Sequence, residues 1–126
     1  PEAEYYATIT VEPLPTPAAI ELTGGRGTHA GVLATDEIEL FTAALATGAS
    51  VAELMPGAPA ASIVVVNAGA LAGYADENPG GGARPPTTAQ VTVSGINPGD
   101  MPVIAVDAVY NYGPAPEPFT LSITVP

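Results

Sequence analysis

Residues 118–125 read PFTLSITV and end the chain with a regular alternation of side chains. The odd-numbered positions from 119 onward are apolar, and the even-numbered positions from 120 onward carry hydroxyls. Because successive side chains of a β-strand point to opposite faces of a sheet, this period of two predicts a strand with one buried face. The same alternation occurs at residues 4–11 (EYYATITV) and 89–95 (AQVTVSG), which indicates an all-β chain.

Shorter apolar segments between turn residues give the remaining strand candidates. They lie at residues 18–23, 28–34, 61–66, 70–75 and 102–110. The continuous run ASIVVV at 61–66 is typical of a strand buried on both faces. Turns are expected at 24–27 (GGRG), 67–69 (NAG) and 97–99 (NPG), and an exposed loop at 76–88.

Residues 35–55 fit two structures. Ile38, Phe41 and Leu45 have helical spacing, with Thr35 near a helix start. The same stretch also fits the two faces of a strand, and Gly48 interrupts either one. Periodicity leaves both alternatives open.

Glycine and proline divide the whole chain into short pieces. There are 14 Gly and 15 Pro in 126 residues, which a helical bundle would not tolerate. We therefore predict a single β-sandwich, jelly-roll or Ig-like, of about eight or nine strands over residues 18–126. Residues 1–17 form an N-terminal extension strand and a proline-rich linker, PLPTP at 13–17.

Charge and cysteine content exclude several functions. Thirteen acidic residues face only two basic ones, Arg26 and Arg84, and the net charge of −11 repels phosphate backbones, so we expect no nucleic-acid binding. No segment reaches the roughly 18 apolar residues of a membrane span. The absence of cysteine removes disulfides and thiol chemistry.

No catalytic constellation is recognisable. His29, the single histidine, has no Gly-x-Ser-x-Gly elbow to serve, so we expect no enzyme and no cofactor. The glycine-rich segments 24–29 and 79–82 lack the ending of a phosphate loop and are interpreted as turns.

Two acidic clusters allow either calcium binding or a solvated face. The first contains Asp36, Glu37 and Glu39, and the second Asp76 and Glu77. Neither follows a calcium-loop pattern, which favours the solvated face. Three threonines beside or near prolines, Thr16, Thr87 and Thr88, are candidate O-glycan sites.

From about residue 31 to 126, the order of motifs resembles the bacterial pre-peptidase C-terminal domain, a β-sandwich of exported proteins. The likeness rests on EIELFTAALATG at 37–48, SIVVVNAGALAGYAD at 62–76, and the tail from NPGD at 97–100 to PFTLSITV. The resemblance implies strand rather than helix for residues 35–55. The chain departs from the family where Ala43 replaces an aromatic residue and glutamates replace aspartates.

The strand upstream of this region is the most informative feature. A strand joined by a stiff proline linker can leave its own domain and complete the sheet of a neighbouring copy. Because such a contact is head-to-tail, it propagates into a filament. The start at Pro1 suggests a processed, exported chain, so we expect an extracellular, pilus-like homopolymer. Its donor-strand interface would contain Tyr5, Tyr6, Ala7, Ile9 and Val11. The alternative is a non-catalytic accessory module that binds a polymer or a parent enzyme, with residues 4–11 paired in cis.

Overall fold

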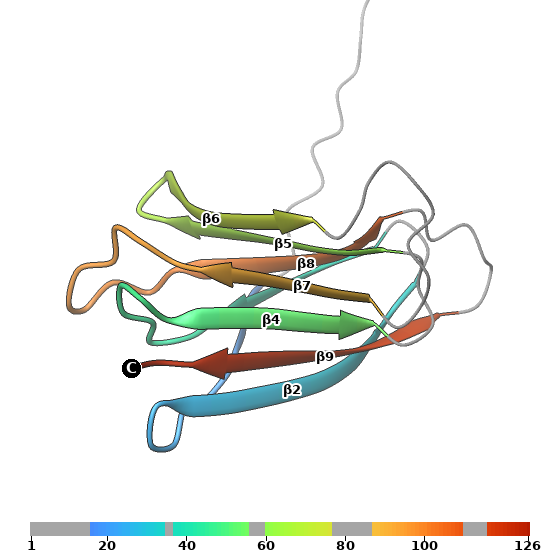
Figure 1. Cartoon of the computed structure of the whole chain (residues 1–126), viewed down its shortest axis with the longest axis horizontal. Helices are drawn as coiled ribbons and strands as arrows, with labels where there is room; N and C mark the ends of the chain where they lie inside the picture. The colour runs from blue at the N-terminus through green and yellow to red at the C-terminus, as the bar shows by residue number, and fades with distance from the viewer. Residues whose placement is uncertain (1–15, 35–36, 56–59, 77–86, 110–115) are drawn as a thin grey trace, which may run out of the picture.

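The computed structural model describes residues 16–34, 37–55, 60–76, 87–109 and 116–126, and these residues form a β-sandwich of two packed sheets without a helix (Figure 1). The nine strands are β1 Ala18–Ala19, β2 Arg26–Leu33, β3 Ile38–Thr42, β4 Ser50–Met55, β5 Ala60–Asn67, β6 Ala70–Asp76, β7 Thr87–Thr92, β8 Val103–Val109 and β9 Glu117–Thr124. The all-β sandwich prediction is confirmed. The expected strand at 4–11 and its five interface residues lie outside the described residues.

The five-stranded sheet has the order β1-β3-β8-β5-β6, and the four-stranded sheet has the order β2-β9-β4-β7. Every pairing is antiparallel except that of β1 with β3. Among the described strands, only β5 and β6 form a hairpin within one sheet; every other pair of consecutive strands lies in different sheets. Strands distant in sequence therefore become neighbours in space, as β2 and β9 do.

The core lies between the two inner faces, and the alternation at the end of the chain supplies part of it. Phe119, Leu121 and Ile123 of β9 are at most 2% exposed. The register continues two of these rows across the sheet, with Leu121 beside Glu53 and Ile123 beside Val51 of β4. Facing them from the five-stranded sheet are Phe41, Ile63, Val65, Ile104 and Val106.

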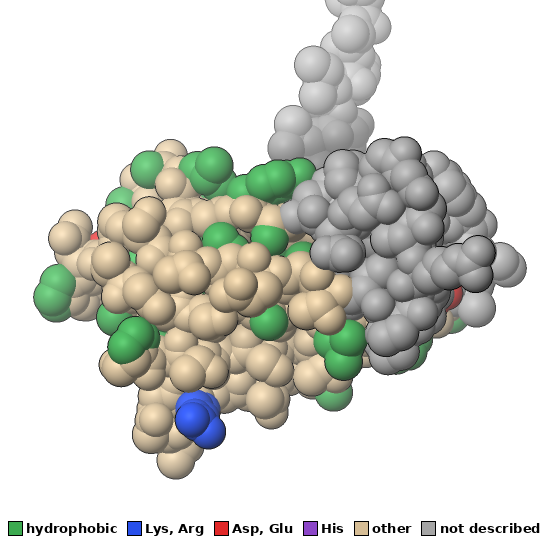
Figure 2. Space-filling view, in the orientation of Figure 1, with side chains coloured by type: hydrophobic (Ala, Val, Ile, Leu, Met, Phe, Trp, Pro, Cys, Tyr) green, Lys and Arg blue, Asp and Glu red, His purple; other side chains and the backbone are tan. Residues whose placement is uncertain are grey.

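The outer face of the four-stranded sheet is rich in hydroxyl groups, and Figure 2 shows this face as mostly tan, with few green side chains. The polar side chains on it come from all four strands: Arg26, Thr28, Ser50, Thr88, Gln90, Thr92, Thr120, Ser122 and Thr124. This face is the solvated one expected from the period-two pattern.

Residues 35–55 contain two strands. The interpretation of this stretch as strand rather than helix is therefore confirmed. β3 begins at Ile38 and ends at Thr42, and β4 follows after the turn at Gly48, which adopts a φ of 93°. Phe41 and Ala43 face the core, and Ile38, 51% exposed, lies on the outer face. The separate strand β4 was not predicted.

Two strand predictions need correction. The strand expected at 18–23 is reduced to Ala18–Ala19, because the chain then leaves the five-stranded sheet; the N–H of Ile20 donates to the Thr42 carbonyl at 2.8 Å. The run at 61–66 is buried on one face only. Ile63 and Val65 are fully buried, whereas Val66 is 38% exposed, because no layer covers the outer side among the described residues.

The crossover from β7 to β8 is fixed by the predicted turn and by one buried amide. Gly99 has a φ of 88°, and the Asp100 N–H donates to the Asn97 carbonyl. The Asn67 side-chain amide, at the end of β5, donates to the Gly95 carbonyl and to Asp100 Oδ2, both at 2.9 Å. These bonds tie the β5–β6 hairpin to the crossover.

Candidate functional site

One lateral side of the sandwich is closed by direct contact between β6 and β7. The Ser94 N–H, just beyond β7, donates to the Ala72 carbonyl of β6 at 3.1 Å. A Cβ placed on Gly73 would lie only 2.7 Å from Cγ2 of Val91. The inward residues of β7 and its continuation, Ala89, Val91 and Val93, are accordingly buried, although β7 is an edge strand.

The opposite lateral side, between β2 and the β3–β1 edge, is open. The inward positions of β2 are Gly27, His29, Gly31 and Leu33; the first three are only half-buried, and Leu33 at the end of the strand is fully buried. The β9 partners of the first three are almost fully buried. Of the three half-buried positions, the described residues cover only Gly27 from this side, where Ile20 and Leu22 cross over.

The outer edge of β2 presents a row of backbone groups that have no strand partner among the described residues. Arg26 exchanges hydrogen bonds with Thr23 on the outer side of the strand. Since backbone groups alternate in direction along an antiparallel strand, the N–H groups of Thr28, Ala30 and Val32 point to the same outer side. β2 pairs only with β9 beyond that bridge in the described ranges, so these three donors, on the part of β2 that follows Arg26, form a template for another strand.

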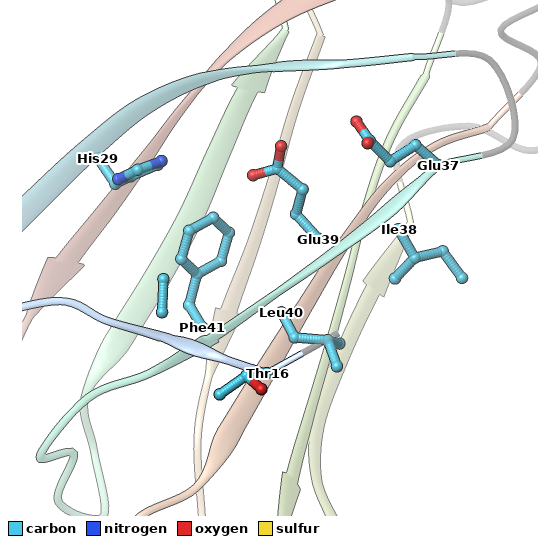
Figure 3. Close-up of a pocket in the computed structure, with 8 residues that line it drawn as sticks. Thr16, His29, Glu37, Ile38, Glu39, Leu40 and Phe41 are labelled. Atoms are coloured by element: carbon cyan, nitrogen blue, oxygen red, sulfur yellow. The ribbon is translucent and has the colours of Figure 1, made fainter. Parts of the chain in front are cut away.

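A pocket of about 240 Å³ lies at this opening. His29 enters it from β2, and Glu39 and Phe41 from β3, while Thr16 and Ala18 line its rim. Figure 3 shows the Glu39 carboxylate between the imidazole of His29 and the carboxylate of Glu37, with the Phe41 ring below. The ring centroids of His29 and Phe41 are 4.7 Å apart.

The pocket is acidic. Glu39 lies on the inward face of β3, in the row of the fully buried Val106 and Ile63. Burial raises the pKa of Glu39, the nearby Glu37 charge raises it further, and His29 acts in the opposite direction. Glu37 is anchored at the start of β3, where its Oε1 accepts the Ala34 N–H at 2.9 Å. An inward-pointing charge near a sheet edge disfavours non-specific pairing of that edge with a strand of another chain.

The structure thus brings together some of the residues that the sequence singled out. His29, Glu37 and Glu39 share the pocket, whereas Asp36 and Glu77 lie outside the described residues. Asp76 ends β6 and belongs to a different strand. Among the described side chains, no group of three histidines or acids is placed to hold a metal ion.

The candidate O-glycan threonines lie in two different places. Thr16 lines the pocket, and Thr87 and Thr88 begin β7. The described ranges contain no helix long and apolar enough to cross a membrane.

Sequence reasoning missed one acid, Glu53. It is fully buried in the core, where Oε1 accepts the Ser62 N–H at 2.9 Å and Oε2 has no hydrogen-bond partner among the described residues. The sequence held a signal for it, because Val51, Glu53 and Met55 alternate and the outer two are buried. The middle residue of such a strand shares their face.

The fold and the site together define a β-sandwich with one closed and one open lateral side. No family model matches the chain, and neither the curated proteins nor the solved structures contain a match. The resemblance to the pre-peptidase C-terminal domain therefore stays a prediction.

Proposed function

We propose that the chain is a structural subunit of an extracellular, pilus-like filament, and that the N-terminal strand of one copy occupies the open side of the next. The observation that carries this proposal is the contrast between the two edges of the four-stranded sheet. The inward residues of β7 are buried, whereas three of the four inward residues of β2, all but Leu33, are only half-buried. A strand added to β2 would give this side the cover that β6 gives the other.

The length and pattern of residues 4–11 suit this position. The segment has eight residues, as does β2. In a strand paired with β2, Tyr5, Ala7, Ile9 and Val11 would face inward over Phe41, with Tyr6 on the outer side. Main-chain hydrogen bonds would supply affinity, and the alternate side chains would supply specificity.

The accessory-module alternative predicts the same strand in cis. β1 runs parallel to β3, so the residues before Ala18 could continue along β3 within one chain. Pro17 fits an outer edge there. The Ile20 N–H points to β3. Because backbone groups alternate in direction along a strand, those of residues 19 and 17 point away from β3, so the N–H that proline lacks at position 17 has no strand partner to lose.

Electron microscopy of the whole chain and of a variant lacking residues 1–12 tests the proposal. We expect filaments from the whole chain, none from the truncated variant, and capped short oligomers when a synthetic peptide of residues 1–12 is added in excess to the whole chain. Normal filaments from the truncated variant would refute donation. A monodisperse monomer of the whole chain at high concentration would support the accessory-module alternative instead.

A further inference from the structure

A buried acid joins the two sheets from β4, which β9 separates from the open edge strand β2. Glu53 lies in the middle of β4, its register partners being Leu121 of β9 and Ala89 of β7, and all three side chains face the core. From there its Oε1 accepts the backbone N–H of Ser62, which belongs to β5 of the other sheet. A single side chain thereby makes a polar tie between the sheets.

No positive charge compensates this carboxyl group in the described structure. Its neighbours on β9 and β7 do not ionise, and the charge that acts on it from β8 is the carboxylate of Asp107. Asp107 and Asp76 of β6 flank Ser62 in the register, one on either side. Glu53 Oε2 is fully enclosed and has no hydrogen-bond partner among the described residues.

An ionised carboxylate in such a place is unstable, since burying a charge without a partner costs several kcal/mol. We propose that Glu53 is a proton-dependent latch: its protonated carboxyl group holds the two sheets together, and loss of the proton releases β4 from β5. Glu53 would then stabilise the sandwich most in acid, opposite in sign to the carboxylates that cause ordinary acid denaturation.

The direction of the pH effect follows from the burial of the carboxyl group. Burial raises the pKa of Glu53 from 4.5 to about 8; the hydrogen bond from Ser62 lowers it, and the Asp107 charge adds to the rise. Below pH 4.5 both the folded and the unfolded chain hold the proton, and the contribution to stability is fully present. Between pH 4.5 and 8 the unfolded chain alone releases it, so stability falls until the folded chain also ionises.

Urea unfolding of the whole chain from about pH 4 to about pH 9 at constant salt measures this effect. We expect the unfolding equilibrium constant attributable to Glu53 to rise up to about tenfold per pH unit between 4.5 and 8, roughly a thousandfold in all. Glu53→Gln keeps an oxygen acceptor for Ser62 and removes the titration, so its curve should lack this rise. Glu21→Gln, at an exposed position, is the matched control and should follow the unmodified chain.

A second measurement needs no variant. The side-chain carbon of Glu53, followed by NMR in the whole chain, should titrate well above the other glutamates, and exchange of the Ser62 amide should accelerate beyond its intrinsic pH dependence as Glu53 ionises. A titration midpoint near the ordinary value of 4.5, or equal pH slopes for the unmodified chain and Glu53→Gln, would overturn the proposal. The latch concerns the core, so loss of filaments in the truncated variant leaves it unaffected.

Discussion

Gly73 sets the distance between β6 and β7 at the closed side, and enlarging it offers a quantitative test of how that side is packed. A Cβ at this position would lie 2.7 Å from Val91 Cγ2 and 3.5 Å from Val93 Cγ1. The nearer contact involves a stiff β-branched side chain, so either the valine or a strand has to shift. Overpacking of this kind costs about 1–3 kcal/mol.

The net effect of Gly73→Ala is smaller than this overpacking cost. Alanine restricts the unfolded chain and returns about 0.4–1 kcal/mol. We therefore expect a destabilisation of about 1–2 kcal/mol, measured as the free energy of unfolding in urea. Val91→Ala, which removes two largely buried methyl groups, should cost about 2 kcal/mol by itself.

The double variant decides the matter, because the methyl group that Gly73→Ala introduces would occupy space that Val91 Cγ2 vacates. The double variant should be less destabilised than the sum of the single variants by about 1–2 kcal/mol. Gly73→Ala combined with Leu33→Ala, which truncates a buried side chain on β2 at the opposite side of the sandwich, is the control and should be additive. Additivity in the Val91 pair would refute this account of the closed side.

Three further predictions concern other parts of the molecule. Asn67→Ala removes both side-chain hydrogen bonds to the β7–β8 crossover and should lower the free energy of unfolding by about 1–3 kcal/mol, read from urea curves. Hydrogen bonds from Asn67 and Asn97 lower the pKa of Asp100, so the contribution of Asp100 to stability is present above pH 3.8 and is lost as the pH falls through its pKa in the folded chain. Asp100→Asn should therefore flatten the acid limb of the curve of unfolding free energy against pH, and an unchanged limb would contradict this. Glu39→Gln removes the inward charge at the open edge and should increase filament yield at neutral pH, measured by sedimentation. In acid, where Glu39 is protonated, the yield of the unmodified chain should approach that of the variant. Equal yields at every pH would count against a role for this charge.

The sequence predicted the strands whose two faces differ in polarity. Residues 118–125 and 89–95 alternate cleanly, and the structure has β9 at Glu117–Thr124 and β7 at Thr87–Thr92, which overlaps the second prediction but begins and ends earlier. β4 was missed because Glu53 occupies an inward position and disguises the alternation of Val51 and Met55. The apolar Val51 and Met55 on either side of Glu53 indicate that it faces inward, but only once a strand has been assigned to this stretch.

The candidate site could be predicted only in part. His29 and Glu39 were singled out as residues, yet 10 positions separate them and nothing in the sequence places them across one opening. Their meeting depends on β2 and β3 lying at the same lateral side of two different sheets. Which edge stays open is a property of topology, and local propensity carries no information about it.

The most direct test of the central claim is residue-resolved amide exchange on the free edge of β2. Thr28, Ala30 and Val32 should exchange rapidly in the chain lacking residues 1–12 and become strongly protected in filaments of the whole chain. His29 and Gly31, whose backbone groups point to β9, should be protected in both. Rapid exchange of the three edge amides in filaments, or their full protection in the truncated monomer, would contradict the claim that this side accepts a strand from a neighbouring copy.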